Sequence, residues 1–348
     1  MNTILPITYP TITSYPGRAN IYAISENNEQ VVPWLMENYI QTESLFMHDK
    51  MECDIDFYIN PTILYRVNSA LETQYIFNPY LSVMSIYTEI IGNESIIGFI
   101  KSKISDGYYI NVDINSKFLT AYDSHFLHAV FIYGYNSQEE FYIADFFKDG
   151  VYSFQTCTFK EMENAIKHYD IKLKTWGGHP NNKSIISLIK INESFKHHFN
   201  IYTFIDNIKE YVNIKNEQQQ IFSKTNRLIS ETPYRKFGNL HYDNVIEYIQ
   251  KSISMQRVIN NYRVFHIFYE HKLALRQRIM YLIGQEIQCQ FLLSDIDYIV
   301  QEALLIRNFI IKENLLQRIN RLDMLVPKLK NLKEKEYIML LQLIEYLE

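Results

Sequence analysis

The sequence has little cysteine, and its few cysteines form no pattern. Cys53, Cys157 and Cys289 are the three present in 348 residues, an odd number at wide spacing. Such a set argues against a disulfide framework and is typical of a chain that folds in a reducing compartment. The expectation is therefore a cytoplasmic protein without structural disulfides.

Long apolar runs and a strong excess of one charge are absent too. No stretch approaches about 18 uninterrupted apolar residues, so no membrane span is expected. The first residues, MNTILPITYPTITSYPGR, contain no basic start followed by an apolar run, so no signal peptide is expected. The formal net charge of −5 gives no electrostatic footprint for nucleic acid.

Motifs that hold common cofactors and metal ions are missing as well. There is no glycine-rich phosphate loop, and EHKLAL at 270–275 lacks the second histidine of a zinc-binding helix. His197 and His198 are adjacent, so on a helix they would point about 100° apart and could not share a metal ion. We therefore expect no cofactor and no metal.

The composition is that of a globular protein with two parts. The chain is 47% hydrophobic and 21% charged, and it is long enough for two domains. Residues 1–192 mix short strands with short helices, whereas residues 193–348 show long stretches of helical periodicity. We predict an α+β domain with an antiparallel sheet at 1–192, followed by an all-helical domain at 193–348.

Within the first part the expected elements are short. Pro33 opens a helix through Gln41, a second helix over 95–105 is capped near Asn93, and Thr158 with Glu161 makes a capping box. Residues 82–91 fit either a strand or a helix. The expected strands are 54–59, 108–114, 126–135, 139–147, 151–159 and 186–191, and the expected long helices are 202–212, 243–253, 258–285, 296–319 and 332–348.

One predicted hairpin carries two residues that can do chemistry. Residues 126–147, FLHAVFIYGYNSQEEFYIADFF, form two apolar strands around the turn Asn136-Ser137. Pairing outward from that turn puts His128 opposite Asp145, with Cβ atoms about 5 Å apart. The carboxylate could then accept the Nδ1 proton and leave Nε2 as a base. The alternative is a histidine and an aspartate that only satisfy each other in the core, and a slip of one residue would separate them.

The order of these elements resembles a known family. Strand GYYINVDI, a histidine opening HAVFIYGY, strand EEFYIAD ending in aspartate, and the capped helix TFKEMENAI are similar to the papain-like fold of the C39 peptidase group. The likeness is greatest to the standalone proteins that resemble the N-terminal domain of butirosin biosynthesis protein H. It covers most of residues 80–192, less of the N-terminus, and the helical part loosely.

The resemblance implies a role for each member of the pair. Proteins of this kind occur in bacterial natural-product pathways, and several transfer acyl groups or form amides on carrier-protein thioesters. His128 would be the general base and Asp145 the residue that orients it. The family's nucleophile is a cysteine at the N-terminus of the first long helix, where thiolate formation is favoured, with a glutamine about six residues upstream.

This sequence departs from the family at the nucleophile. The helix after Gly17 carries Ala19 and Asn20 where the cysteine is expected, and Ser14 stands near the place of the glutamine. Ser14 is one substitute that His128 could activate. A reaction that needs only His128 as base is another, in which an amine or hydroxyl attacks an acyl thioester held by a partner.

Cys53 is a further substitute for the nucleophile, because it precedes His128 by 75 residues, within the spread of papain-like nucleophiles. Its neighbours Glu52, Asp54 and Asp56 would raise the pKa of the thiol.

Three functions follow, in order of preference. The first is acyl transfer or amide formation on a carrier-tethered thioester, with a small-molecule amine or acyl substrate. The second is a catalytically inactive papain-like protein that binds a carrier protein or a substrate. The third is a cysteine hydrolase that uses Cys53.

The expected partner is an acyl or peptidyl carrier protein, with no nucleic acid and no membrane. The basic run Lys328–Lys335 could dock such an acidic protein, or could be a solvated helix face. The apolar helix at 258–283 leaves both a monomer and a homodimer open.

Overall fold

The computed structural model describes residues 2–58, 78–91, 95–169, 184–212, 235–319 and 321–348. The chain forms two compact units, and each unit is built from two segments. The first unit combines Met1–Val32 with Tyr65–Lys196, and the second combines Pro33–Leu64 with His197–Glu348. We predicted a single boundary at 192, which would assign 33–64 to the α+β part; in the structure this segment groups with the helices instead.

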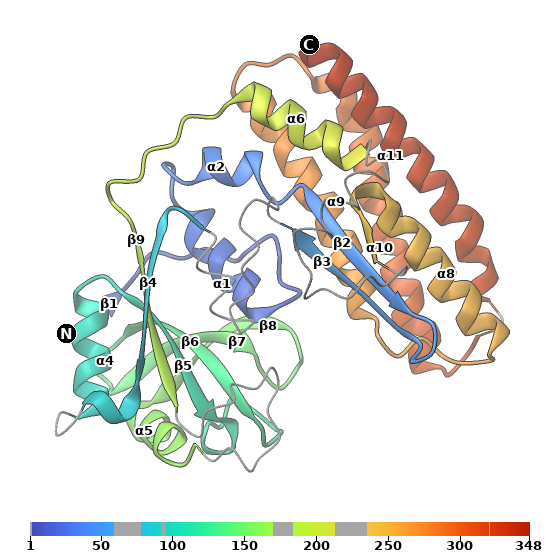
Figure 1. Cartoon of the computed structure of the whole chain (residues 1–348). Coiled ribbons are helices and arrows are strands. Elements are labelled where there is room, and N and C mark those ends of the chain that lie inside the picture. The colour runs from blue at the N-terminus through green and yellow to red at the C-terminus, as the bar shows by residue number, and fades with distance from the viewer. Residues whose placement is uncertain (1, 59–77, 92–94, 170–183, 213–234, 320) are drawn as a thin grey trace. The chain divides into compact units, whose positions relative to one another are not determined.

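The first unit contains a seven-stranded antiparallel sheet (Figure 1). The strand order is β4-β9-β5-β6-β7-β8, and β1 pairs with β6 as well. Of the segment 82–91, the first part is strand and the end is a 3-10 turn, η2 (Thr88–Ile91). The strand bounds are β1 (Thr3–Ile4), β4 (Leu81–Tyr87), β5 (Tyr109–Asn115), β6 (Leu127–Tyr135), β7 (Glu140–Phe146), β8 (Tyr152–Thr158) and β9 (Ile185–Ile191).

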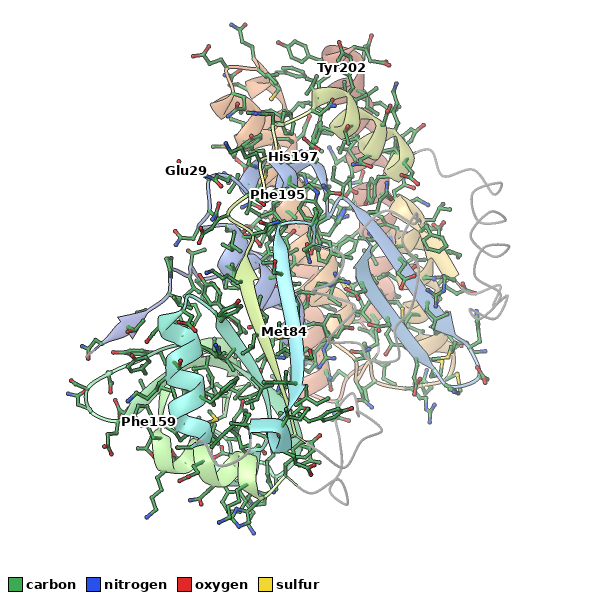
Figure 2. All side chains as sticks on the ribbon, turned by 60° about the vertical axis from the view of Figure 1, so that its left-hand side comes forward. Glu29, Met84, Phe159, Phe195, His197 and Tyr202 are labelled. Carbon is green, nitrogen blue, oxygen red and sulfur yellow. The ribbon has the colours of Figure 1, made fainter. Side chains whose placement is uncertain are left out.

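The predicted antiparallel α+β architecture is confirmed in this coarse sense. Strands β5 to β8 follow one another across the sheet in chain order. Strand β9, the last of this sheet in the sequence, crosses back to lie between β4 and β5. The outer strand β4 carries Met84, which is 59% exposed and is labelled in Figure 2.

The helices of the first unit are short, and two of them cover one face of the sheet. Their bounds are α1 (Pro16–Ser25), α4 (Ile96–Ser105), η3 (Ser116–Phe118) and α5 (Phe159–Lys167). Ile100 of α4 and Met162 of α5 are fully buried in the same apolar cluster as Val130 and Ile132 of β6. Phe159, labelled in Figure 2, starts α5 with its ring 4.6 Å from that of Phe141.

Two helix caps test the sequence. The predicted capping box is confirmed, because Thr158 accepts from the N–H of Glu161 and the Glu161 carboxylate accepts from the N–H of Thr158. The cap of α4 is Ser95, whose hydroxyl accepts from the N–H of Gly98. The predicted cap, Asn93, lies outside the described residues.

The second unit joins a small sheet to a set of long helices (Figure 1). Within the described residues the sheet order is β10-β2-β3. Helix α10 packs against both α9 and α11. No described helix has the length and apolar character needed to cross a membrane. The bounds are α2 (Val32–Glu37), β2 (Gln41–Met47), β3 (Glu52–Tyr58), α6 (Ile201–Val212), β10 (Arg235–Phe237), η4 (Gly238–Leu240), α8 (His241–Ser254), α9 (Arg263–Gly284), η5 (Gln290–Leu292), α10 (Leu293–Leu315), η6 (Leu322–Met324) and α11 (Leu325–Leu347).

The helix predicted from Pro33 through Gln41 was too long. It ends at Glu37, and the chain enters β2 at Gln41. Strand β2 pairs with β3 at all seven positions. These ladder bonds to the next strand in the chain outweigh the helical pattern of a short stretch.

The hairpin with the histidine and the aspartate has a longer loop than the predicted two-residue turn. Asn136 closes this loop: its N–H donates to the carbonyl of Glu140 (2.9 Å), and its side-chain oxygen accepts from the N–H of Gln138 (2.9 Å). Tyr135 consequently pairs with Phe141 instead of Gln138, so the predicted register was wrong.

A β-bulge then shifts the pairing back. Going from the loop back along β6, the register changes between Gly134 and Ile132. Beyond that point Phe131 pairs with Ala144, two positions beyond its predicted partner Tyr142. Beyond the bulge the net displacement is even, so the residues of β6 from Ile132 back to His128 keep the face predicted for them. Tyr135, on the loop side of the bulge, is displaced by three positions and joins the face of Val130 and Ile132. A Cβ on Gly134 would lie 2.7 Å from the carbonyl oxygen of Thr3, so glycine lets β1 pair at this point.

Candidate functional site

His128 and Asp145 are in contact on the sheet. Nε2 of His128 lies 2.9 Å from Oδ2 of Asp145. Continuing the register of Phe131 with Ala144 puts Val130 opposite Asp145, so the imidazole reaches the carboxylate diagonally from β6 to β7. The Asp145 side chain is 1% exposed and the His128 side chain 19% exposed. The carboxylate is thus enclosed, while part of the imidazole reaches solvent.

The nitrogen that faces the carboxylate is Nε2, whereas we expected Nδ1. Neutral His128 therefore carries its proton on Nε2 and donates it to Asp145, which leaves the lone pair on Nδ1. Within the described residues the polar contact of His128 is with Asp145 alone. The basic atom of this site is Nδ1.

A third residue, which the sequence did not single out, completes the arrangement. The hydroxyl of Tyr122 donates a hydrogen bond to Oδ2 of Asp145, the oxygen that also faces His128. The Tyr122 ring packs 5.2 Å from that of Phe147 and 5.8 Å from that of Phe126. Tyr122 stands in an irregular turn before β6, where no periodicity points to the sheet, so no sequence pattern predicts its contact with Asp145.

Opposing effects set the pKa of His128. Burial lowers it, because it disfavours the imidazolium, while the charge and hydrogen bond of Asp145 and the charge of Asp113 raise it. The attraction prevails, and the pKa lies above its ordinary value of 6.5. Asp113 lies on β5 opposite Ala129, next to His128.

Helix α1, which carries Ala19 and Asn20, lies on the face of the sheet opposite to His128 and Asp145. His128 and Asp145 share the face of Val130 and Ile143, which α4 and α5 cover. Helix α1 contacts the opposite face: the side-chain oxygen of Asn20 accepts from the hydroxyl of Tyr152 (2.7 Å). Tyr152 pairs with Phe146, and their rings lie 5.7 Å apart, so both point away from the carboxylate.

Within the described residues, the His128 imidazole therefore forms no hydrogen bond with Ala19 or Asn20, which stand where the family has its cysteine. Ala19 and Asn20 are 0% and 2% exposed within α1, whose residues from Gly17 to Ser25 are all buried. Ser14, just before this helix, is buried too, and it is not among the polar contacts of His128.

Cys53 lies in the second unit, on β3 opposite Phe46. Its side chain is buried, and burial, followed by the charges of Asp54 and Glu247, raises the pKa of the thiol far above its usual range. A thiol in this setting stays protonated at neutral pH and is a poor nucleophile. Cys157 and Cys289 are free and buried as well.

The basic run on α11 is partly engaged within the unit. Lys328 lies 3.3 Å from a Glu302 carboxylate oxygen, and Lys333 lies 2.6 Å from one of Asp243. The ammonium of Lys335 sits 4.9 Å from the centre of the Tyr298 ring.

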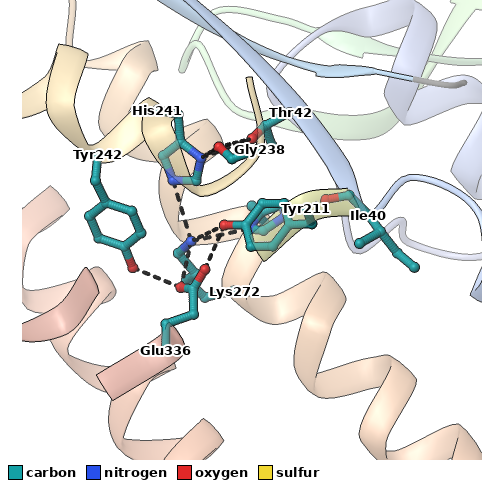
Figure 3. Close-up of polar contacts among 9 residues, drawn as sticks. Ile40, Thr42, Tyr211, Gly238, His241, Tyr242, Lys272 and Glu336 are labelled. Carbon is teal, nitrogen blue, oxygen red and sulfur yellow. Dashed lines mark hydrogen bonds and ion pairs between the residues drawn. The ribbon is translucent and has the colours of Figure 1, made fainter. Parts of the chain in front are cut away.

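A second concentration of titratable groups lies inside the second unit, around Lys272 (Figure 3). Its ammonium is 0% exposed and lies 2.7 Å from Oε2 of Glu336. It also lies 3.1 Å from Nδ1 of His271 and 3.4 Å from Nε2 of His241. Because an ammonium has only hydrogens to offer, both imidazoles must accept here and are neutral.

The remaining atoms of this Lys272 cluster are satisfied. Nε2 of His271 donates to the carbonyl of Ile40 (2.8 Å), and Nδ1 of His241 donates to that of Gly238 (2.8 Å). The Glu336 carboxylate accepts from the hydroxyls of Tyr211 (2.5 Å) and Tyr242 (2.7 Å). This charge-balanced network is closed within the described residues, and its polar side-chain atoms are already paired.

The fold and site thus define an α+β protein with an additional helical unit and one partly exposed histidine held by a buried aspartate. No protein-family model matches the chain, and a search of curated proteins finds no match. In the described part of the chain no three histidine, cysteine, aspartate or glutamate side chains gather as metal ligands.

Proposed function

We propose that the protein transfers acyl groups to amines from carrier-bound thioesters, with His128 as general base. The observation that carries the proposal is the state of this imidazole: Nε2 is fixed by buried Asp145, while Nδ1 has no partner in the described residues and the ring is partly exposed. An oriented base with one free nitrogen is the minimum that proton abstraction requires.

The reaction needs no covalent enzyme intermediate. Nδ1 of His128 takes a proton as the amine nitrogen attacks the thioester carbonyl carbon. The carbon–nitrogen bond forms, the carbon–sulfur bond breaks, and the imidazolium returns the proton to the departing thiolate. This version suits a chain in which Ala19 and Asn20 occupy the first helix and Cys53 is a buried, protonated thiol.

The substrate class and the setting come from the family resemblance. A histidine opening β6, an aspartate near the end of β7 and the capped helix α5 follow in the order of the C39-like proteins that resemble the N-terminal domain of butirosin biosynthesis protein H. The proposal accordingly includes a papain-like fold for the first unit, a carrier protein as donor and a cytoplasmic location.

The test compares native protein with His128→Ala. Acyl thioesters of phosphopantetheine, free and on carrier proteins, are mixed with primary amines, and amide formation is followed by mass spectrometry. We expect the variant to lose at least about 100-fold in rate, the scale of general-base catalysis. Equal rates in the two proteins would rule out the enzymatic function.

A matched control is His125→Ala, which removes an exposed histidine three residues away. It should retain the native rate. Loss of activity in both variants would point to disturbance of the strand instead of loss of a base.

A binding protein without catalysis is the second candidate. The observation that favours it is α1, which is buried from Gly17 to Ser25 and carries Ala19 and Asn20 where the family has its cysteine. Under this function, neither native protein nor His128→Ala would form amide, and both would bind acyl-carrier proteins with the same affinity.

A further inference from the structure

We propose that Tyr122 is a positioning residue of this site: it locks the Asp145 carboxylate in the orientation that holds the His128 imidazole, and it shares the charge of the oxygen that the imidazole uses. This inference rests on the proposed function, because it assigns a role within the same base.

The carboxylate has two partners in the described part of the chain, and both use the same oxygen. Oδ2 of Asp145 accepts from the Tyr122 hydroxyl and faces Nε2 of His128 at 2.9 Å. Oδ1 is buried and has no hydrogen-bond partner among the residues that the structure describes. Without Tyr122, the imidazole would be the one described contact that keeps the carboxylate from rotating.

Tyr122 can act only as a donor here. Burial, followed by the charge and hydrogen bond of Asp145, raises the pKa of the phenol well above its ordinary value of 10.0. The hydroxyl thus stays protonated wherever a histidine base is useful, and its proton points at the carboxylate throughout.

The backbone around Tyr122 is fixed by both neighbouring elements. The N–H of Lys148, after β7, donates to the carbonyl of Ala121 (3.3 Å). The N–H of Thr120 donates to the Glu161 carboxylate (3.1 Å), the same side chain that closes the capping box of α5. The start of α5 therefore fixes the turn that aims the phenol.

A shared acceptor has a measurable consequence for the base. A hydroxyl bonded to Oδ2 disperses part of its negative charge, so the imidazole meets a weaker partner than a lone carboxylate. Removal of the hydroxyl should leave more charge for His128 and stabilise its imidazolium. It should also loosen the carboxylate, so that the Nε2-protonated tautomer is less populated.

The experiment is NMR titration of His128 in native protein and Tyr122→Phe, with the resonance assigned by its absence in His128→Gln. We expect the pKa of His128 to rise by about half a unit or more in Tyr122→Phe. We also expect its neutral-state ¹⁵N shifts to move toward a mixture of tautomers. An unchanged or lowered pKa in folded Tyr122→Phe would overturn the inference.

Tyr135→Phe is the matched control. It removes a phenol from the same sheet face that is bonded to Ser105 instead of Asp145 (3.0 Å), and it should leave the titration of His128 unchanged. If Tyr122→Phe does not fold, the NMR signal of the Tyr122 hydroxyl proton in the native protein tests the inference instead. We expect a downfield, slowly exchanging resonance that is lost in Asp145→Asn. Its absence from the native protein would contradict the inference.

These readouts need no turnover. A shifted His128 titration together with full thioester chemistry in His128→Ala would uphold the role of Tyr122 and reject the proposed function. An unshifted titration with an inactive His128→Ala would do the reverse.

Discussion

His128 differs from a satisfied core histidine in what surrounds each of its nitrogens. The histidines of the Lys272 cluster, His241 and His271, have partners on both nitrogens and are fully buried. His128 has a partner on one nitrogen and is partly exposed. The contrast lies within one chain, and it is the basis for the role of base that we propose for His128.

Asp145→Asn should lower the pKa of His128, because the opposite charge and the charge-assisted hydrogen bond disappear while burial remains. NMR titration measures this change. In native protein the rate of amide formation should fall as pH drops through the pKa of His128, above 6.5, because only the neutral imidazole accepts a proton. This acid limb of the pH–rate profile should move to lower pH in the variant. A limb that stays in place would mean that another group controls it.

The same raised pKa affects stability with a defined sign. Native His128 binds its proton more tightly than the unfolded chain, so its contribution is full below pH 6.5 and is lost as pH rises through the folded pKa. In mildly acidic solution, below pH 6.5, His128 therefore does not change how the free energy of unfolding varies with pH.

At the level of elements, periodicity and caps were predictable, and register was not. The capping box at Thr158 and the long helices depend on residues within a few positions of one another. The hairpin register depended on the side chain of Asn136, which closes the loop, and on the bulge next to Gly134, where β1 pairs with β6. The residues of β6 from His128 to Ile132 kept their predicted face because the two errors together moved their pairing by an even number.

The site was predictable to the same extent. The His128–Asp145 contact follows from strand alternation, which is local. The choice of Nε2 over Nδ1 depends on the diagonal approach that the bulge creates, and Tyr122 enters through a turn held by Glu161. These features arise from packing between segments, so no local pattern encodes them.

Thr158→Ala should destabilise the first unit by about 1 kcal/mol, the usual effect of losing a helix N-cap. It also removes the hydroxyl bond to Glu161, whose carboxylate holds Thr120 near the site, and leaves the bond from the backbone N–H of residue 158. Urea unfolding measures the loss. Thr156→Ala, an exposed change on the same strand, is the control and should have little effect. Equal stability of both variants would show that the cap contributes nothing.

For the molecule as a whole, the Lys272 cluster should make the second unit sensitive to acid. Burial, followed by the charge of Lys272, holds the pKa of both His241 and His271 well below the ordinary value of 6.5. Below pH 6.5 these two histidines are therefore protonated in the unfolded chain and remain neutral in the native protein. Stability should fall with falling pH by up to about 1.4 kcal/mol per unit for each histidine.

Urea unfolding between pH 6.5 and 5.5, followed by Trp34 fluorescence in a Trp176→Phe background, measures this slope. His271→Gln should reduce it by about half, whatever the variant's stability at higher pH. His198→Gln, a change at an exposed histidine, should preserve it. A native slope near zero would contradict the neutral assignment of the two buried imidazoles.

Lys272→Met should destabilise the second unit by about 3–5 kcal/mol, because it leaves the buried Glu336 carboxylate without its cation. Urea unfolding at neutral pH measures this loss. Adding Glu336→Gln should restore part of it, since the unpaired charge is then gone. Lys312→Met, on the exposed side of α10, is the control. Equal stability of single and double variants would mean that the ion pair is not the source.

The division of each unit between two stretches of chain dictates an order of assembly. A ribosome releases β2 and β3 well before the helices that complete their unit, with the segment Tyr65–Lys196 made in between. The carbonyl of Ile40, which accepts from His271, belongs to that early stretch. A truncated product that starts at His197 would therefore lack this acceptor, so fragments meant to isolate the helices should retain Pro33–Leu64, joined through a linker or a circular permutation.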